Sequence, residues 1–184
     1  SQSYACEEHG ISVGELEPRM FSFNNPQGAC PHCAGLGEMR RIAEDRLIPD
    51  KNLSLREGAI AVNGFKSLED ESWNGPLFMA VGERFGFTLD MPIKDFSDKA
   101  YDVLLHGSGN EVYDVTRYFG GEGRERKAKF EGIVPMIEQR MQMGMGAEYY
   151  EQFVEEALCP VSGAKRLNPM SLAVTVGGLN IHEF

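Results

Sequence analysis

The residues with the clearest potential for chemistry are Cys30 and Cys33, which lie in the run Gly-Ala-Cys-Pro-His-Cys-Ala-Gly-Leu-Gly at 28–37. Two thiolates separated by two residues can bind one tetrahedral zinc ion, and the glycines permit the tight backbone of a zinc knuckle. A structural zinc site needs four ligands, so this motif supplies half of one. The alternatives are a pair of buried thiols and a redox pair. The redox pair is disfavoured because Gly35 and Gly37 follow the motif where a thioredoxin-type helix would run.

Two other parts of the sequence offer the missing ligands. Cys6 and His9 form an upstream CxxH pair, which would complete a Cys3His site. Cys159 begins the run Cys-Pro-Val-Ser-Gly, which has the shape of a second knuckle with Ser162 at the last ligand position. A serine hydroxyl is a poor zinc ligand beside thiolate or imidazole. The residues alone leave both arrangements open.

The second candidate site is a cluster of basic residues in an acidic chain of net charge -10. Its members are Arg117, Arg124, Arg126, Lys127 and Lys129. On a projecting hairpin these side chains would contact DNA phosphates and position the duplex without reading bases. The net charge argues against a protein that coats nucleic acid through its overall field, so any DNA contact must be local. The alternative interpretation is that these residues only form a charged, solvent-exposed face of the hairpin.

Other residues that resemble functional groups are interpreted as structural. The sequence contains no GxxxxGK[ST] phosphate-binding loop, so the chain by itself is not expected to bind ATP or to be an enzyme. His106 follows an apolar helical segment and is interpreted as structural rather than catalytic. Four aromatic residues, Trp73, Phe78, Phe85 and Phe87, follow a helical spacing and are predicted to be core residues rather than a base-stacking platform.

The pattern of apolar and turn-forming residues predicts a mixed α+β fold. We expect helices at 76–85 and 98–105, strands at 112–119 and 124–130 in a hairpin, helices over 131–158 broken at Gly144 and Gly146, and a buried strand at 172–176. The segment 1–37 is rich in turn formers and has little helical periodicity, so it needs an external constraint such as a metal ion.

Composition limits the class of protein. A chain of 184 residues with 42% hydrophobic and 25% charged residues can bury one ordinary core or two small ones. Four cysteines are too few for the disulfide framework of a small secreted domain. No apolar run approaches the roughly 18 to 20 residues that span a bilayer. We therefore expect a cytoplasmic protein without a membrane partner.

Two long blocks of sequence carry a resemblance to a known protein family. The first is Glu-Leu-Glu-Pro-Arg-Met-Phe-Ser-Phe-Asn-Asn-Pro at 15–26, which runs into the knuckle. The second begins at Cys159 and continues through Lys-Arg-Leu-Asn-Pro at 165–169 and Leu-Ala-Val at 172–174. These two blocks resemble UvrA, the A subunit of the bacterial excinuclease ABC. The middle of the chain is similar to this family in length and in its landmarks Gly-Ser-Gly at 107–109 and Phe-Glu-Gly at 130–132.

The resemblance implies a domain organisation and a ligand set. Residues 1–37 would form the zinc-binding base, which is part of the first signature domain. Residues 38–145 would form an inserted α+β domain that faces DNA. Residues 146–184 would return to the signature domain and carry the remnant of the second knuckle. Cys30 and Cys33 would share their zinc with Cys159, and Cys6 and His9 would belong to another site. Ser162 stands where the family has a cysteine, which leaves three strong ligands.

The resemblance also implies a function. The chain would be the DNA-binding, DNA-positioning and structural zinc segment of a damage-recognition ATPase that acts in nucleotide excision repair and the SOS response. It would not be catalytic on its own, and ATP would bind only to the full-length parent. The implied partners are double-stranded DNA and, through the parent, UvrB and a second UvrA copy. The alternative is a free-standing zinc-dependent module for protein–protein interaction.

Overall fold

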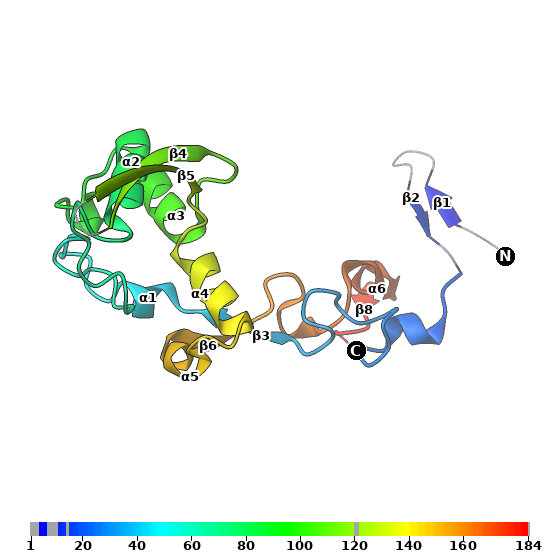
Figure 1. Ribbon diagram of the computed structural model, residues 1–184. Coiled ribbons are helices and arrows are strands. Elements are labelled where there is room, and N and C mark those ends of the chain that lie inside the picture. Colours follow the sequence, from blue (N-terminus) through cyan, green and yellow to red (C-terminus); the bar gives the residue numbers. More distant parts are fainter. Residues whose placement is uncertain (1–3, 7–10, 14, 120–121, 184) are drawn as a thin grey trace. The chain divides into compact units, whose positions relative to one another are not determined.

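The computed structural model describes residues 4–6, 11–13, 15–119 and 122–183, and for residues 4–6, 11–13 and 119 only the backbone. The chain divides into two compact units. The terminal unit comprises Ser1–Arg41 and Glu155–Phe184, and the middle unit is the continuous segment Ile42–Val154. The middle unit therefore interrupts the terminal unit in the sequence. Helices and small antiparallel sheets occur together (Figure 1), which confirms the predicted α+β fold.

The terminal unit consists of short elements joined by turns. They are β1 (Tyr4–Cys6), β2 (Ile11–Val13), the 3-10 helix η1 (Pro18–Phe21), β3 (Glu38–Ile42), β6 (Val154–Leu158), the 3-10 helix η4 (Gly163–Lys165), α6 (Pro169–Ala173), β7 (Thr175–Val176) and β8 (Leu179–Asn180). The strands pair as β1 with β2, β3 with β6, and β7 with β8. Long regular elements are absent from this part of the described chain, so its cross-links come mostly from turns and side chains.

Two predictions for the returning segment are wrong. The helix expected to reach residue 158 ends earlier, and Val154–Leu158 forms strand β6 because its backbone pairs with β3. Pairing with a distant strand here outweighs local helical preference. The buried strand expected at 172–176 is also wrong. Asn168 caps helix α6, with Pro169 at its first turn, and Val176 in the two-residue β7 is 68% exposed.

The middle unit has a continuous apolar core built from helices and one hairpin. Its elements are α1 (Glu44–Leu47), α2 (Gly75–Phe85), the 3-10 helix η2 (Ile93–Asp95), α3 (Asp98–His106), β4 (Val112–Phe119), β5 (Glu122–Lys129), α4 (Ile133–Gln142), α5 (Ala147–Tyr150) and the 3-10 helix η3 (Glu151–Phe153). The predicted helices at 76–85 and 98–105 and the predicted hairpin strands are confirmed.

Local sequence explains where the two confirmed helices begin and end. Helix α2 has Pro76 in its first turn and ends at Gly86, whose left-handed conformation (φ 85°) suits glycine. Helix α3 begins at Ser97, whose hydroxyl accepts a hydrogen bond from the N–H of Ala100 at 3.1 Å. At its other end, the His106 Nε2 atom lies 3.0 Å from a carboxylate oxygen of Glu44.

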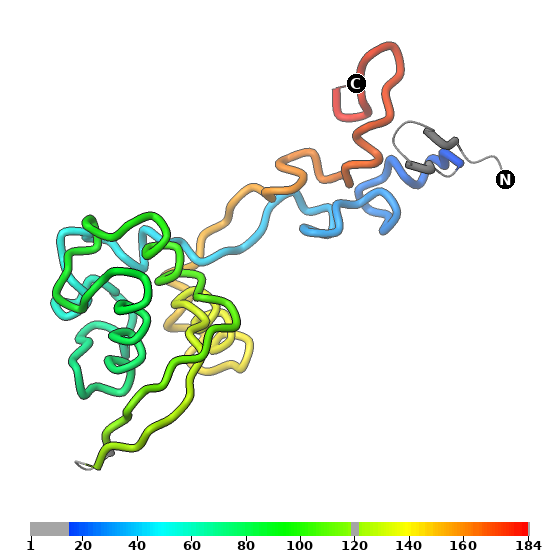
Figure 2. The backbone as a smooth tube through the Cα atoms, turned by 90° about the horizontal axis from the view of Figure 1, so that it is seen from above, coloured from blue at the N-terminus to red at the C-terminus, as the bar shows by residue number. Residues whose placement is uncertain are grey.

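The β4–β5 hairpin is anchored to the core at one end and extends away from the helices at the other (Figure 2). Helix α2 lies against β4 (Figure 1). Phe130, which follows β5, is fully buried and packs edge-on against Phe78 of α2, with 5.1 Å between ring centroids. This contact fixes the base of the hairpin. None of the helices in the described residues is long and apolar enough to cross a membrane.

Candidate metal centre and nucleic-acid interface

Three buried thiols meet in the terminal unit. The Sγ atoms of Cys30, Cys33 and Cys159 all lie within 4.8 Å of one another, and Cys30 and Cys159 are 3.9 Å apart. Four zinc ligands at about 2.3 Å in a tetrahedron place neighbouring sulfurs about 3.8 Å apart. The donor set therefore fits one zinc ion, with three thiolates as its strong ligands. The side chain of Cys6 and all of His9 lie outside the described residues.

Hydrogen bonds between the two knuckles bring these thiols together. The N–H of Cys30 donates to the carbonyl of Arg166 at 2.9 Å, and the N–H of Cys159 donates to the carbonyl of Gly37 at 2.9 Å. Each knuckle thus binds the backbone that flanks the other. The Nε of Arg166 also donates to the carbonyl of Gly35 at 2.6 Å, and its guanidinium stacks 3.7 Å from the ring centroid of Phe23.

The glycines at 35 and 37 make this crossing possible. Both have positive φ, 78° and 83°, where a side chain would be strained. A Cβ on Gly35 would lie 2.1 Å from the carbonyl oxygen of Phe23, and one on Gly37 would lie 2.9 Å from the Arg166 side chain. The same glycines that argued against a redox helix in the sequence therefore allow the two knuckles to pack.

Ser162 completes the cluster as its fourth polar group. It is buried, and its hydroxyl lies 3.5 Å from the Cys33 sulfur. Its hydrogen bond, helped by the N–H of Gly37, lowers the pKa of the Cys33 thiol to about 6 against the opposing effect of burial. Burial also opposes ionisation of Cys159, but the hydroxyl and N–H of Ser162 outweigh it and lower the pKa of that thiol. The site therefore favours thiolates, the form that binds metals.

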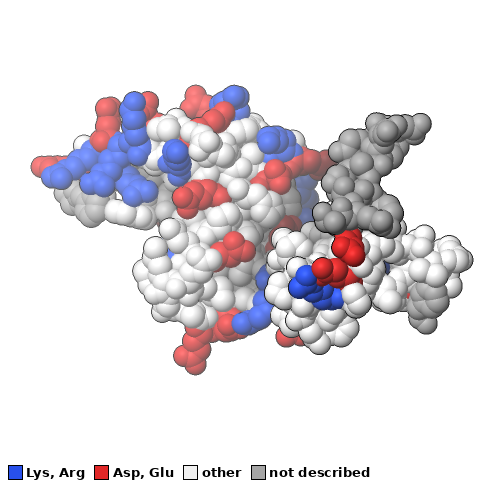
Figure 3. All heavy atoms as spheres, turned by 90° about the vertical axis from the view of Figure 1, so that its right-hand side faces the viewer, with Lys and Arg blue, Asp and Glu red and all other residues white. Residues whose placement is uncertain are grey.

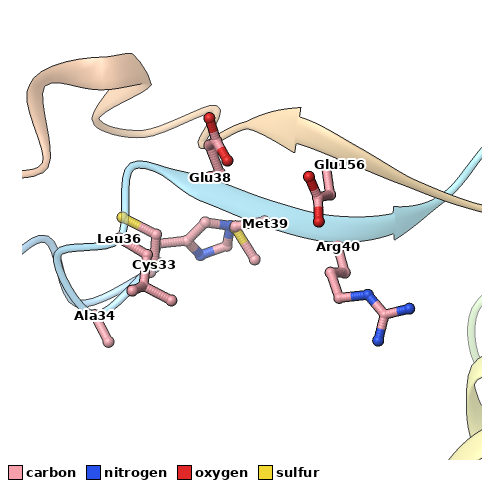
Figure 4. Close-up of a pocket in the computed structure, with 8 residues that line it drawn as sticks. Cys33, Ala34, Leu36, Glu38, Met39, Arg40 and Glu156 are labelled. Atoms are coloured by element: carbon pink, nitrogen blue, oxygen red, sulfur yellow. The ribbon is translucent and has the colours of Figure 1, made fainter.

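A cavity of about 510 Å³ opens beside the cluster (Figure 4). Its lining residues come from the first knuckle and from strands β3 and β6: His32, Cys33, Ala34, Leu36, Glu38, Met39, Arg40 and Glu156. The cavity places solvent next to Cys33.

The predicted basic cluster lies on the β4–β5 hairpin, and the strand register divides it between two faces. Arg117 is opposite Arg124, and Arg126 is opposite the buried Val115, so these three arginines share one face. Lys127 is opposite Asp114 and Lys129 is opposite Val112, on the other face. Arg124, Arg126, Lys127 and Lys129 are all exposed. Lys and Arg side chains gather over this hairpin on the surface in Figure 3.

Trp73 lies beside the arginine face, and its prediction as a core residue is wrong. It belongs to the loop before α2 and is 53% exposed, with the guanidinium of Arg117 at 4.4 Å from its ring centroid. Phe78 and Phe87 are buried, as predicted. Helical spacing could not separate these cases because Trp73 precedes the first residue of α2, where the helical period does not yet apply.

The chain is similar to known proteins of one family. Residues 44–154 match the family described as the UvrA DNA-binding domain. The whole chain is 40% identical over 188 residues to the UvrABC system protein A of Clostridium perfringens, and it covers 20% of that protein. A similar protein of Treponema pallidum is 40% identical over 187 residues, which are 99% of this chain and 19% of the relative. The chain belongs to the UvrA DNA-binding domain family.

The solved structure of UvrA2 from Deinococcus radiodurans shares the fold. The TM-score is 0.61 at 24% identity, over 93% of this chain and 22% of that one. The chain thus spans about a fifth of the length of the relatives it matches. The resemblance to UvrA that the two terminal blocks indicate is confirmed, because the whole chain is similar to UvrA proteins.

Proposed function

We propose that this chain is the DNA-positioning and structural-zinc segment of a UvrA-type damage-recognition ATPase of nucleotide excision repair, and that it is not catalytic on its own. The observation that carries the proposal is the exposed row of cationic side chains on β5. This row lies inside the residues that match the UvrA DNA-binding domain.

The charge distribution supports DNA as the occupant of the hairpin. The chain carries a net charge of -10, so a duplex is repelled by most of its surface. The β5 row concentrates Arg124, Arg126, Lys127 and Lys129 within six positions on a hairpin that extends away from the helices (Figure 2). Phosphate contacts of this kind supply most non-specific DNA affinity and orient a protein on the duplex.

Zinc is the metal that best fits the cysteine cluster. Thiolate ligands in a tetrahedron favour zinc over hard cations, and a structural zinc contributes directly to folding stability. Cys30, Cys33 and Cys159 would hold the ion. The fourth position would be taken by the hydroxyl of Ser162 or by a water molecule. The ion would then join the two halves of the terminal unit.

The remaining functions belong to the parent protein under this proposal. ATP binding and hydrolysis, the contact with UvrB and pairing with a second UvrA copy would occur in the cytoplasm through parts outside these 184 residues. The 184-residue sequence has no phosphate-binding loop, which fits a segment that positions DNA for an ATPase encoded elsewhere in the same protein.

The test is the salt dependence of duplex binding by the 184-residue chain. We expect the dissociation constant to rise steeply with salt. Replacing Arg124, Arg126, Lys127 and Lys129 together with Ala should lower the slope of log Kd against log salt by about 0.9 for each DNA phosphate that the variant no longer neutralises. The measurement is fluorescence anisotropy of labelled duplex over a series of salt concentrations.

A matched control removes the same charge elsewhere. The exposed residues Lys66, Lys94, Lys99 and Lys165 lie outside the hairpin, and their joint replacement with Ala changes the net charge equally. This control should leave most of the slope intact. Equal effects of the two variants would show that overall charge, rather than the hairpin, governs binding. Capture of a protein partner by a chain that does not bind DNA would favour the interaction-module alternative.

A further inference from the structure

The indole of Trp73 occupies an unusual position for a large aromatic side chain. More than half of this residue is exposed, whereas Phe65, Phe78 and Phe130 are fully buried. Trp73 is also the only tryptophan in the sequence, so its fluorescence reports on this position alone.

The loop that carries Trp73 is held rigidly on both sides. The Ser72 hydroxyl donates to the carbonyl of Glu69 at 2.8 Å and accepts hydrogen bonds from the N–H groups of Glu69 and Gly75. The Asn74 side-chain amide donates to the carbonyl of Gly64 at 3.2 Å. A Cβ on Gly75 would lie 1.8 Å from the carbonyl oxygen of Glu69, so glycine is required there. Neighbouring polar anchors thus present the indole outward in a fixed place.

The partner of the indole within the chain is the arginine face of the hairpin. The guanidinium of Arg117 lies 4.4 Å from the Trp73 ring centroid, and Arg117 is opposite Arg124 in the strand register. The Nε of Arg117 is buried and has no hydrogen-bond partner among the described residues. An exposed aromatic ring therefore lies beside one guanidinium group, that of Arg117, on the face of the hairpin that also carries Arg124 and Arg126.

We propose that Trp73 is a stacking site for an unpaired or unstacked DNA base whose flanking phosphates are held by the Arg117, Arg124 and Arg126 face. This inference rests on the proposed DNA-positioning function and adds to it a preference for DNA that contains an unpaired base. Aromatic side chains beside cationic grooves bind single-stranded bases by stacking, without regard to base identity. In a fully paired duplex the base faces are covered by their neighbours, and only base edges are accessible in the grooves.

The free-energy cost of unstacking a base determines which DNA binds best. Bringing a base face onto the indole requires that the base leave its stack, and this cost is smallest where the base is already unpaired. The chain should therefore prefer a duplex with one unpaired base over the same duplex fully paired. Stacking on one aromatic ring corresponds to a change in Kd of about five-fold or more.

The experiment titrates the 184-residue chain with two duplexes of equal length, one fully paired and one with a single central unpaired base. We expect the second to bind at least about five-fold more tightly and to quench the fluorescence of Trp73 more strongly at saturation. Trp73→Ala should abolish the difference in Kd, measured by anisotropy of labelled DNA. Trp73→Phe, which keeps a ring, should retain part of it. Neither substitution should change the salt slope, because no charge is removed.

Tyr118→Ala is the matched control. Tyr118 is also an exposed aromatic residue, but its position in the register puts it on the opposite face of the hairpin from Arg117. This variant should keep the preference for the unpaired base. A Trp73→Ala chain that keeps the full preference, or an unaltered chain that binds both duplexes equally, overturns the stacking inference alone. An unaltered chain that binds neither duplex overturns the proposed function as well.

Discussion

The sulfur atoms of Cys30 and Cys159 lie 3.9 Å apart, although 129 positions separate the two residues in the sequence. The whole middle unit lies between them in the chain. The contact therefore links the segment before the middle unit to the segment after it. A bound zinc ion would restrict the unfolded chain and would also stabilise the folded terminal unit.

The first prediction compares Cys159→Ala with Cys6→Ala. Because the Cys159 thiol lies in the cluster with Cys30 and Cys33, its removal should leave two thiolates and lower both bound zinc and the melting temperature. The measurements are zinc content after dialysis and thermal unfolding with and without added zinc. If only Cys6→Ala lowers both quantities, the local Cys3His arrangement with His9 is correct.

The second prediction concerns Ser162→Cys. The Ser162 hydroxyl lies 3.5 Å from the Cys33 sulfur, so a thiol at this position would supply the fourth strong ligand. Loss of an outer-shell partner changes metal affinity by about 10–100-fold, and gain of a direct ligand should tighten zinc binding by on the order of tenfold or more. Competition with a chromophoric chelator measures this change. Ser162→Ala is the control for the size of the side chain, and an equal gain from both substitutions would speak against a direct ligand.

The third prediction separates the two faces of the hairpin. Arg124→Ala with Arg126→Ala removes two charges from the face that contains Arg117, whereas Lys127→Ala with Lys129→Ala removes two from the opposite face. If DNA contacts the face beside Trp73, the arginine pair should weaken duplex binding more than the lysine pair. Both double variants have the same net charge, so long-range attraction is matched. A larger effect of the lysine pair would show that DNA binds the face that carries Lys127 and Lys129.

The fourth prediction tests how the hairpin is anchored. Phe130 is fully buried against Phe78, so Phe130→Ala should lower the free energy of unfolding by about 3–5 kcal/mol. Urea denaturation measures the change. The exposed Tyr118 provides the comparison, and Tyr118→Ala should change the same quantity by less than about 0.5 kcal/mol. A small effect at Phe130 would mean that the hairpin base is not part of the cooperative core.

Elements whose signals are local can be predicted from residue order. Helix α2 follows from apolar spacing between Pro76 and Gly86, and strand β4 follows from alternation and its β-branched and aromatic residues. The two blocks that resemble UvrA also depend only on residue order, and the family is confirmed. The cysteine pair at 30 and 33 was visible for the same reason, because its two ligands are neighbours in the chain.

Other features depend on segments that are distant in the sequence, and these follow only from the folded chain. Strand β6 exists because β3 lies beside it, which the helical preference of residues 147–158 does not show. The position of Cys159 beside Cys30 depends on hydrogen bonds between two knuckles. The division of the basic cluster into two faces depends on strand register, and the exposure of Trp73 depends on anchors at Ser72 and Asn74. Local patterns fix the backbone of a short segment, whereas the environment of a side chain is set by the segments that the fold brings to it.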